Sequence, residues 1–232
     1  MTVLLLHGLG CTGRVWDGVR ELAPDAVAPD LAGHGSAPRL DTYTYGAWAA
    51  ELLERLRPEG PLQVIGHSLG GAVGLELAAR GDVDVEIVVG LGIKSSWSDD
   101  DLAGMARVAD KGVTWFDELD VAVDRHLLTT GLRGLLDPAS DAVRAGVTSE
   151  DGRWRLAVDP EVHRVGAFDL GECLGRVGAA VLLARGVDDA MSVTDELADH
   201  HVPIVEIADA GHNAHVERPA EVLALLERAG AA

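Results

Sequence analysis

Cysteine is scarce in this 232-residue chain, which has only Cys11 and Cys173. Two thiols so far apart do not form the disulfide framework of a small secreted domain, so a reducing cytoplasm is the expected location. The sequence also lacks a Cys-x-x-Cys pair and any Cys/His cluster with the spacing of a zinc site. We therefore expect no metal and no cofactor.

Basic residues are few as well. The chain has 19 Lys and Arg against 38 Asp and Glu, which gives a formal net charge of −19. Such a charge repels phosphate backbones and anionic lipids, so we expect neither a nucleic-acid partner nor a membrane partner. No apolar run approaches the ~18 residues of a membrane span. The apolar start at residues 1–6 has no basic flank and is too short for a signal peptide, so it is interpreted as a strand.

The chain is long enough for one domain, and its 47% hydrophobic content indicates a globular protein. Short apolar runs that predict buried strands alternate with amphipathic stretches that predict helices. This alternation is typical of a parallel sheet with helices on both faces. The predicted strands are 3–6, 26–31, 62–65, 85–90, 181–184 and 203–207, and the predicted helices are 12–23, 45–56, 71–79, 193–200 and 218–229.

The alternation stops after Lys94, and no clear strand is predicted between residues 95 and 178. This segment has helical patterns at 99–111, 115–129, 141–145 and 159–173. It is interpreted as a helical lid, inserted after the strand at 85–90 into a core made of 1–94 and 179–232. Extra helices with a private core are the alternative, since either use explains the five aromatic residues found there, Trp97, Trp115, Phe116, Trp154 and Phe168.

The most informative stretch is 62–74, in which a short apolar run passes through Gly66-His67-Ser68-Leu69-Gly70 into an Ala-rich helical pattern. A strand, a Gly-x-Ser-x-Gly turn and a helix together predict a sharp bend that exposes Ser68 at a helix N-terminus. The backbones of Gly66 and Gly70 would lie too close for a Cβ atom. A chance match is the alternative, because the chain contains 28 glycines.

Further loops follow the other predicted strands, and the carboxyl ends of parallel strands meet at one edge of a sheet. His7-Gly8-Leu9-Gly10 is either a ligand-approaching loop or only a turn. The Asp30–Gly35 loop contains His34, which we interpret as a structural hydrogen-bonding residue. Gly186–Asp189 supplies two adjacent carboxylates, and Gly211-His212 supplies an imidazole.

Together these motifs resemble the α/β-hydrolase family, over nearly the whole chain. The matching patterns are H-G-L-G, D-L-x-G-H-G, G-H-S-L-G-G, G-x-x-D and G-H-x-x-x-x-E-R-P. The resemblance implies an α/β-hydrolase fold, here with a six-stranded, mostly parallel sheet. Family members usually begin with an antiparallel hairpin, whereas here the His-Gly strand opens the sequence, so the run at 26–31 is expected at one edge.

The family's functional residues map onto individual positions. Ser68 matches the nucleophile and His212 the general base. Asp189 matches the triad acid better than its neighbour Asp188 does. The oxyanion donors would be the backbone N–H groups of Leu9 and Leu69.

One rival to this assignment is His215, three residues beyond His212. It is a second imidazole in the same loop. We expect it behind the site or at the surface.

The chemistry follows from the residue types. A serine hydroxyl needs a base to accept its proton, and a buried carboxylate fixes the orientation of that base. We therefore predict a serine hydrolase that cleaves a small carboxylic ester, a lactone or a thioester through an acyl-enzyme on Ser68. The expected partner is a small acyl substrate, and the sequence leaves the oligomeric state open.

Two other functions stay open. Families with the same triad also catalyse carbon–carbon bond hydrolysis and lyase or synthase reactions of the menaquinone-pathway type. A fold alone does not determine which reaction is catalysed. The third hypothesis is a ligand receptor without catalytic activity. An anionic substrate would need basic groups in the inserted segment, and most of those there are interpreted as solvated surface charges: Arg125, His126, Arg133, Arg153, Arg155, His163 and Arg164.

Overall fold

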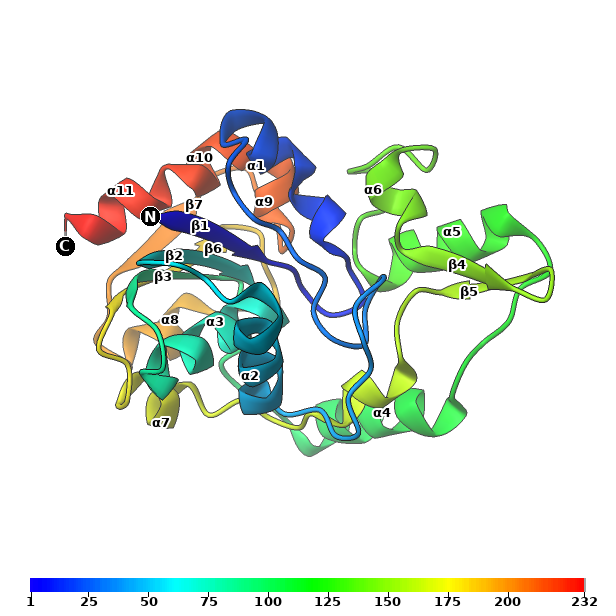
Figure 1. Cartoon of the computed structure of the whole chain (residues 1–232), viewed down its shortest axis with the longest axis horizontal. Helices are drawn as coiled ribbons and strands as arrows, with labels where there is room; N and C mark the ends of the chain where they lie inside the picture. Colours follow the sequence, from blue (N-terminus) through cyan, green and yellow to red (C-terminus); the bar gives the residue numbers. More distant parts are fainter. Residues whose placement is uncertain (232) are drawn as a thin grey trace.

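A five-stranded parallel sheet forms the centre of the molecule (Figure 1). The computed structural model describes residues 1–231. The strands lie in the order β1-β2-β3-β6-β7, and all neighbours pair in parallel. Their bounds are Thr2–Leu6 for β1, Leu62–His67 for β2, Val85–Leu91 for β3, Ala180–Gly186 for β6 and Ile204–Ile207 for β7.

The sheet is buried on both faces because its strands are apolar at consecutive positions. Leu5, Ile65 and Val89 point to one hydrophobic cluster. Their neighbours Leu4 and Val64 point to a second cluster on the opposite face. Since side chains alternate along a strand, each strand contributes to two separate cores.

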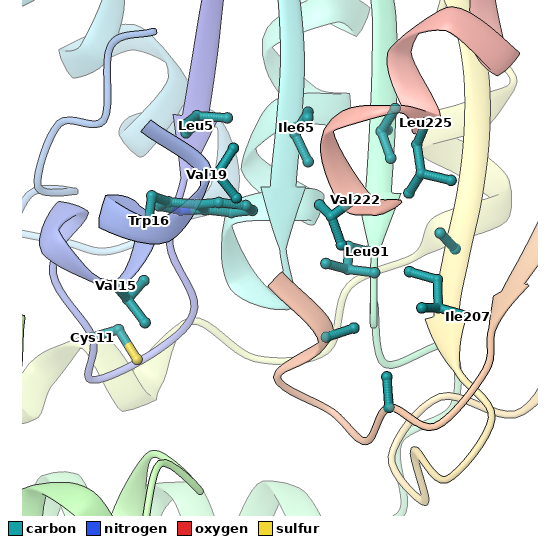
Figure 2. Packing of buried hydrophobic residues seen from close by; sticks show 14 of the residues in the cluster. Leu5, Cys11, Val15, Trp16, Val19, Ile65, Leu91, Ile207, Val222 and Leu225 are labelled. Carbon is teal, nitrogen blue, oxygen red and sulfur yellow. The ribbon is translucent and has the colours of Figure 1, made fainter. Parts of the chain in front are cut away.

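Helices cover both faces, as the alternating pattern predicts (Figure 1). The first face is covered by η1 (Gly13–Trp16), α1 (Asp17–Leu22), α10 (Pro219–Leu223) and α11 (Leu225–Gly230). Figure 2 shows Trp16 and Val19 lying near Leu5 on this face, with Leu225 from α11. The second face is covered by α2 (Tyr45–Leu56), α3 (Leu69–Arg80), α7 (Leu170–Leu174) and α8 (Thr194–Ala198).

The prediction of a sixth strand at 26–31 is wrong. Within residues 26–31, only Val27 pairs with β1, through hydrogen bonds to the backbones of Val3 and Leu5. Pro29 has no N–H to donate to a ladder. The N–H of Leu31 donates instead to the side chain of His7 at 2.9 Å. The segment therefore leaves the sheet edge after one bridge.

The segment between β3 and β6 contains strands that the sequence analysis missed. It comprises α4 (Asp99–Lys111), α5 (Leu119–Thr129), α6 (Asp141–Arg144), β4 (Val147–Glu150), β5 (Arg153–Leu156), η2 (Pro160–Arg164) and α7. The antiparallel pair β4 and β5 is joined by Asp151 and Gly152, which both have positive φ. Asp-Gly at a two-residue hairpin turn is a strong local signal, and it was available in the sequence.

Helix boundaries follow local signals where these are strong. α2 and α4 have the predicted bounds, and each begins after a capping side chain, Thr44 and Ser98. The predicted helix at 159–173 is instead two short pieces, η2 and α7. The segment just after His212 forms α9 (Ala214–Glu217), a short helix that the sequence analysis does not include.

Three remaining expectations concern the chain as a whole. Among residues 1–231, no helix is both long and apolar enough to cross a bilayer. Cys11 and Cys173 are both free thiols and both buried. Ala232, the last residue of the predicted core, lies outside the described residues.

Two glycines allow the backbones of β1, β2 and α3 to meet. A Cβ atom on Gly66 would lie 2.2 Å from the carbonyl oxygen of Gly70, and one on Gly70 would lie 2.3 Å from that of Leu6. Backbone atoms cannot move aside as a flexible side chain can. The prediction that a Cβ atom would clash at Gly66 and Gly70 is therefore confirmed.

We expect Gly66→Ala to lower the free energy of unfolding by about 3 kcal/mol or more, because the new methyl group overlaps a peptide unit. Gly178→Ala is the matched control, since a Cβ atom there meets nothing within 4 Å. Urea denaturation of both variants measures the difference. Equal stabilities would contradict the steric account.

Candidate active site

Ser68 lies at the bend between β2 and α3, in a backbone conformation that is rare for a residue with a side chain. Its φ is 51° and its ψ is −115°. The bend is held because the Ser68 N–H donates to Leu91 O at 2.8 Å, and its carbonyl accepts from the N–H groups of Gly71 and Ala72. A strained backbone conformation of this kind persists where the surrounding contacts hold it in place. Ser68 lines a cavity at the carboxyl ends of the strands.

His212 and Asp189 are joined in the structure, although 23 residues separate them. The Nδ1–H of His212 donates to Asp189 Oδ2 at 3.0 Å. The Asp189 side chain is fully buried, and its Oδ1 accepts from the Met191 N–H at 2.8 Å. Asp188 is exposed. The geometry thus pairs His212 with Asp189, which leaves Nε2 of a neutral His212 free to accept a proton.

Arg185 holds the loop that carries Asp189, and the sequence analysis did not single it out. Its guanidinium donates to the carbonyl oxygens of Asp189 at 2.7 Å, Ser192 at 2.6 Å and Val187 at 3.1 Å. Glu206 on β7 balances its charge at 2.8 Å. The only available signal was an arginine at the end of a predicted strand, which by itself does not indicate such a role.

Three further contacts hold His212 and its loop. The Nε2–H of His67 donates to the His212 carbonyl oxygen at 2.9 Å. A Cβ atom on Gly92 would lie 3.2 Å from Asp189 Oδ2 and 3.3 Å from His212 Nδ1, so β3 ends tightly against this pair. Asn213 donates to the carbonyl oxygens of Thr130 and Gly131, which ties the His212 loop to the end of α5.

The loop at 7–10 crosses beside Ser68. A Cβ atom on Gly8 would lie 3.5 Å from the Cβ atom of Ser68 and 2.8 Å from His67 Nδ1. Leu9 and Leu69 both line the cavity with Ser68. Within residues 1–231, neither the Leu9 N–H nor the Leu69 N–H donates to a protein acceptor. Two backbone donors near the hydroxyl are therefore available to a ligand.

His7 orients that loop through both ring nitrogens. Its Nε2 accepts the Leu31 N–H at 2.9 Å, so its Nδ1 carries the proton and donates to Gly8 O at 2.8 Å. Burial lowers its pKa to about 4. His34 is also buried, as expected of a structural residue, and its Nδ1–H donates to Ala32 O at 3.2 Å.

His215 is buried behind the site and is not at the surface. Its ring centroid lies 4.3 Å from that of His67 and 4.5 Å from that of Trp16. Burial and the nearby His212 lower its pKa to about 3. Within residues 1–231, neither of its ring nitrogens has a hydrogen-bond partner. His215 does not line the cavity, whereas His67, His163 and His212 do. Of these three, within residues 1–231, only His212 is hydrogen-bonded to a carboxylate.

The cavity has a volume of about 1240 Å³ and is bounded by both parts of the chain. The loops after the strands contribute Ser68 and His212. The segment between β3 and β6 contributes apolar side chains, among them Trp97, Phe116 and Phe168. A mostly apolar wall with a few polar groups is typical of a site for an organic molecule, and the volume exceeds the roughly 300–1,000 Å³ usual for such sites. Among residues 1–231, no three His, Cys, Asp or Glu side chains are grouped to hold a metal ion.

Comparisons with known proteins agree with this architecture. Residues 3–225 match the model of the "Alpha/beta hydrolase family", so the chain belongs to that family. The chain is 29% identical to "Lipase LipV" of Mycobacterium tuberculosis, over 97% of this chain and 91% of the lipase. It is 26% identical to "Esterase YbfF" of Escherichia coli, over 97% and 91% of the two chains. Its fold matches the crystal structure of the esterase Rv0045c of M. tuberculosis with a TM-score of 0.78 at 23% identity, covering 98% of this chain and 83% of that one.

The family assignment is consistent with the motif around His212. Glu217, the glutamate of the G-H-x-x-x-x-E pattern, accepts the Gly211 N–H at 3.0 Å. This bond closes the turn that presents His212. The protein is thus an α/β hydrolase with relatives named as a lipase and an esterase.

The buried histidines make stability depend on pH. Burial depresses the pKa values of His7, His34, His126 and His215 from 6.5 to about 3 or 4, and that of His67 well below 6.5. Below pH 6.5 the histidines of the unfolded chain therefore bind protons, whereas these buried histidines of the folded chain do not. The stabilisation is complete above pH 6.5 and is lost as the pH falls toward 4.

We expect the free energy of unfolding to fall by about 1 kcal/mol for each of these histidines between pH 7 and pH 5.5. Urea denaturation at the two pH values measures the change. In His215→Gln the fall should be about 1 kcal/mol smaller. A stability that is constant or higher at pH 5.5 would refute the assignment of neutral buried rings.

Proposed function

We propose that the protein is a serine hydrolase that cleaves a small carboxylic ester, a lactone or a thioester. The observation that carries this proposal is the His212–Asp189 hydrogen bond, because His212 lines the same cavity as the strained Ser68. The proposed catalytic residues are Ser68, His212 and Asp189. No other imidazole lines the cavity beside Ser68 with a carboxylate on its far nitrogen.

In the proposed reaction, Ser68 Oγ attacks the acyl carbon while His212 Nε2 takes the hydroxyl proton. The tetrahedral intermediate collapses when His212 gives that proton to the leaving oxygen or sulfur, and an acyl-enzyme remains on Ser68. A water molecule, deprotonated by His212, then releases the acid. Asp189 keeps Nδ1 protonated and stabilises the imidazolium that forms twice in this cycle.

The proposed oxyanion donors are the N–H groups of Leu9 and Leu69. Negative charge develops on the carbonyl oxygen in each transition state, and Leu69 begins α3, where the helix dipole favours an anion. A preorganised donor of this kind lowers the barrier by roughly 3 kcal/mol. His7 keeps the 7–10 loop in place through its bond to Gly8.

We also propose that residues 95–178 act as a lid on a core formed by 1–94 and 179–232. The support is the cavity, whose apolar side chains come largely from this segment, while Ser68 and His212 come from the core. The lid would exclude water and choose the acyl group. We keep the cytoplasm as the proposed location, since both cysteines are free.

We expect Ser68→Ala to reduce the turnover of a p-nitrophenyl ester by about 10⁴-fold or more, because it removes the attacking hydroxyl. Esters with acyl chains of two to eight carbons should be assayed to find the preferred length. Ser149→Ala is the matched control, since Ser149 is exposed on β4 and outside the cavity.

Retention of turnover in Ser68→Ala would remove this residue from the mechanism. If the native protein turned over none of these esters, the ester-hydrolase proposal would fail. The carbon–carbon hydrolase or lyase reading would then take its place.

A further inference from the structure

The cavity reverses the charge balance of the protein. The chain as a whole has twice as many acidic as basic residues. Among the residues that line the cavity, six are basic and only two, Asp101 and Glu217, are acidic. The basic residues are Lys94, Arg107, Lys111, Arg125, Arg133 and Arg155. The chain has only two lysines, and both are in this set.

The two acidic residues are already engaged. Asp101 pairs with Lys94 at 3.2 Å and caps the N-terminus of α4 through Ser98. Glu217 accepts the Gly211 N–H. Among residues 1–231, neither carboxylate lies within 4.0 Å of a charged nitrogen of the other five basic residues around the cavity.

Three of the basic residues have no carboxylate partner. Among residues 1–231, no Asp or Glu oxygen lies within 4.0 Å of the charged nitrogens of Arg107, Lys111 or Arg125. Arg133 differs, because it is bound by Asp124 at 2.6 Å. The three unpaired cations are exposed, which places them at the open part of the cavity.

The orientation of α4 accounts for this separation of charge. Arg107 and Lys111 are one turn apart and so share a face, and both line the cavity with Met105 and Val108. Asp110 points elsewhere and pairs with Arg164. The helix thus turns an apolar and cationic face inward, although it begins with three aspartates.

In the cavity, the charges of the lining side chains act on a ligand more strongly than distant surface carboxylates do. Surface carboxylates more than about 8–10 Å away are screened at physiological ionic strength. A ligand within the cavity is therefore governed by the nearest side chains. Within residues 1–231, three cations and one carboxylate, Glu217, line the cavity without an ion-pair partner, so the unpaired charge there is positive on balance. Arg107 and Lys111 lie one turn apart on α4 and repel each other, and an anion would relieve this repulsion.

We propose that the substrate is an ester or thioester that carries a negatively charged group, separated by a spacer from the acyl carbon. This inference rests on the proposed function. Arg107, Lys111 and Arg125 bind the anion, and the apolar wall binds the spacer. All six basic residues lie between positions 94 and 155, whereas Ser68 and His212 come from the sheet loops, so the charge and the reacting carbon occupy different walls.

Two matched substrate pairs test the proposal and locate the charge. p-Nitrophenyl hydrogen adipate and p-nitrophenyl hexanoate differ by a carboxylate on the acyl side. S-Hexanoyl-4′-phosphopantetheine and S-hexanoylpantetheine differ by a phosphate on the leaving side. We expect kcat/KM to be at least about tenfold higher for the charged member of one pair, and that pair identifies which side carries the anion.

The Arg107→Gln/Lys111→Gln/Arg125→Gln variant should lose this preference, measured as the ratio of kcat/KM within the pair, and a native circular dichroism spectrum shows that it is folded. Arg228→Gln, at an exposed position on α11 outside the cavity, is the control for a change in net charge and should keep the preference. Equal kcat/KM within both pairs would overturn the proposal while leaving the ester hydrolase intact. A preference that survives in the triple variant would also overturn it. Failure of the proposed function looks different, because then no neutral ester is turned over in a Ser68-dependent way.

Discussion

The close approach of three backbone segments at Ser68 is the constraint on which the rest of the structure depends. β1, β2 and α3 meet where Gly66 faces the Gly70 carbonyl and Gly70 faces the Leu6 carbonyl. This contact forces Ser68 into its positive φ and places the start of α3 beside the 7–10 loop. One steric condition therefore exposes the hydroxyl and brings two backbone donors next to it.

The second half of the site is assembled by hydrogen bonds from another part of the sheet. Arg185 fixes the carbonyl oxygens around Asp189, and Asp189 fixes the His212 ring. His67, adjacent to Ser68, holds the His212 backbone. Because the neighbouring histidines are buried and neutral, no cation from that side competes with His212 for Asp189. The site is thus rigid on the side of the core, and its cationic and apolar wall comes from the segment between β3 and β6.

Much of this arrangement could be predicted from the sequence, because short apolar runs and glycine-flanked loops have strong local signatures. α2 and α4 were predicted to the residue, and the loops bearing Ser68 and His212 were correctly found at strand ends. The prediction of a sixth strand failed although the composition of residues 26–31 favours a strand. Pro29 has no N–H for strand pairing, and the Leu31 N–H donates to His7 instead of to β1. The β4–β5 hairpin was missed because its strands are short and polar. Its Asp-Gly turn carried the available signal.

Long-range contacts also limit what can be predicted from the sequence. The link from Arg185 to Asp189 joins residues four apart, yet it depends on how the loop folds back. The side of α4 that faces the cavity depends on packing against η2, which no periodicity in α4 alone specifies. Most of the basic residues singled out in this segment, such as Arg125 and Arg133, were interpreted from sequence as solvated charges, and Arg107 and Lys111 were not singled out. The position of these four around one cavity is visible only in the fold.

The most direct test of the central claim is the crystal structure of the protein after reaction with an alkyl fluorophosphonate, which imitates the tetrahedral intermediate. The account predicts one phosphorus atom bonded to Ser68 Oγ, with its phosphoryl oxygen within hydrogen-bond distance of the N–H groups of Leu9 and Leu69. His212 Nε2 should lie within reach of Ser68 Oγ. An unreacted Ser68, or an adduct whose phosphoryl oxygen points away from both amides, would contradict it.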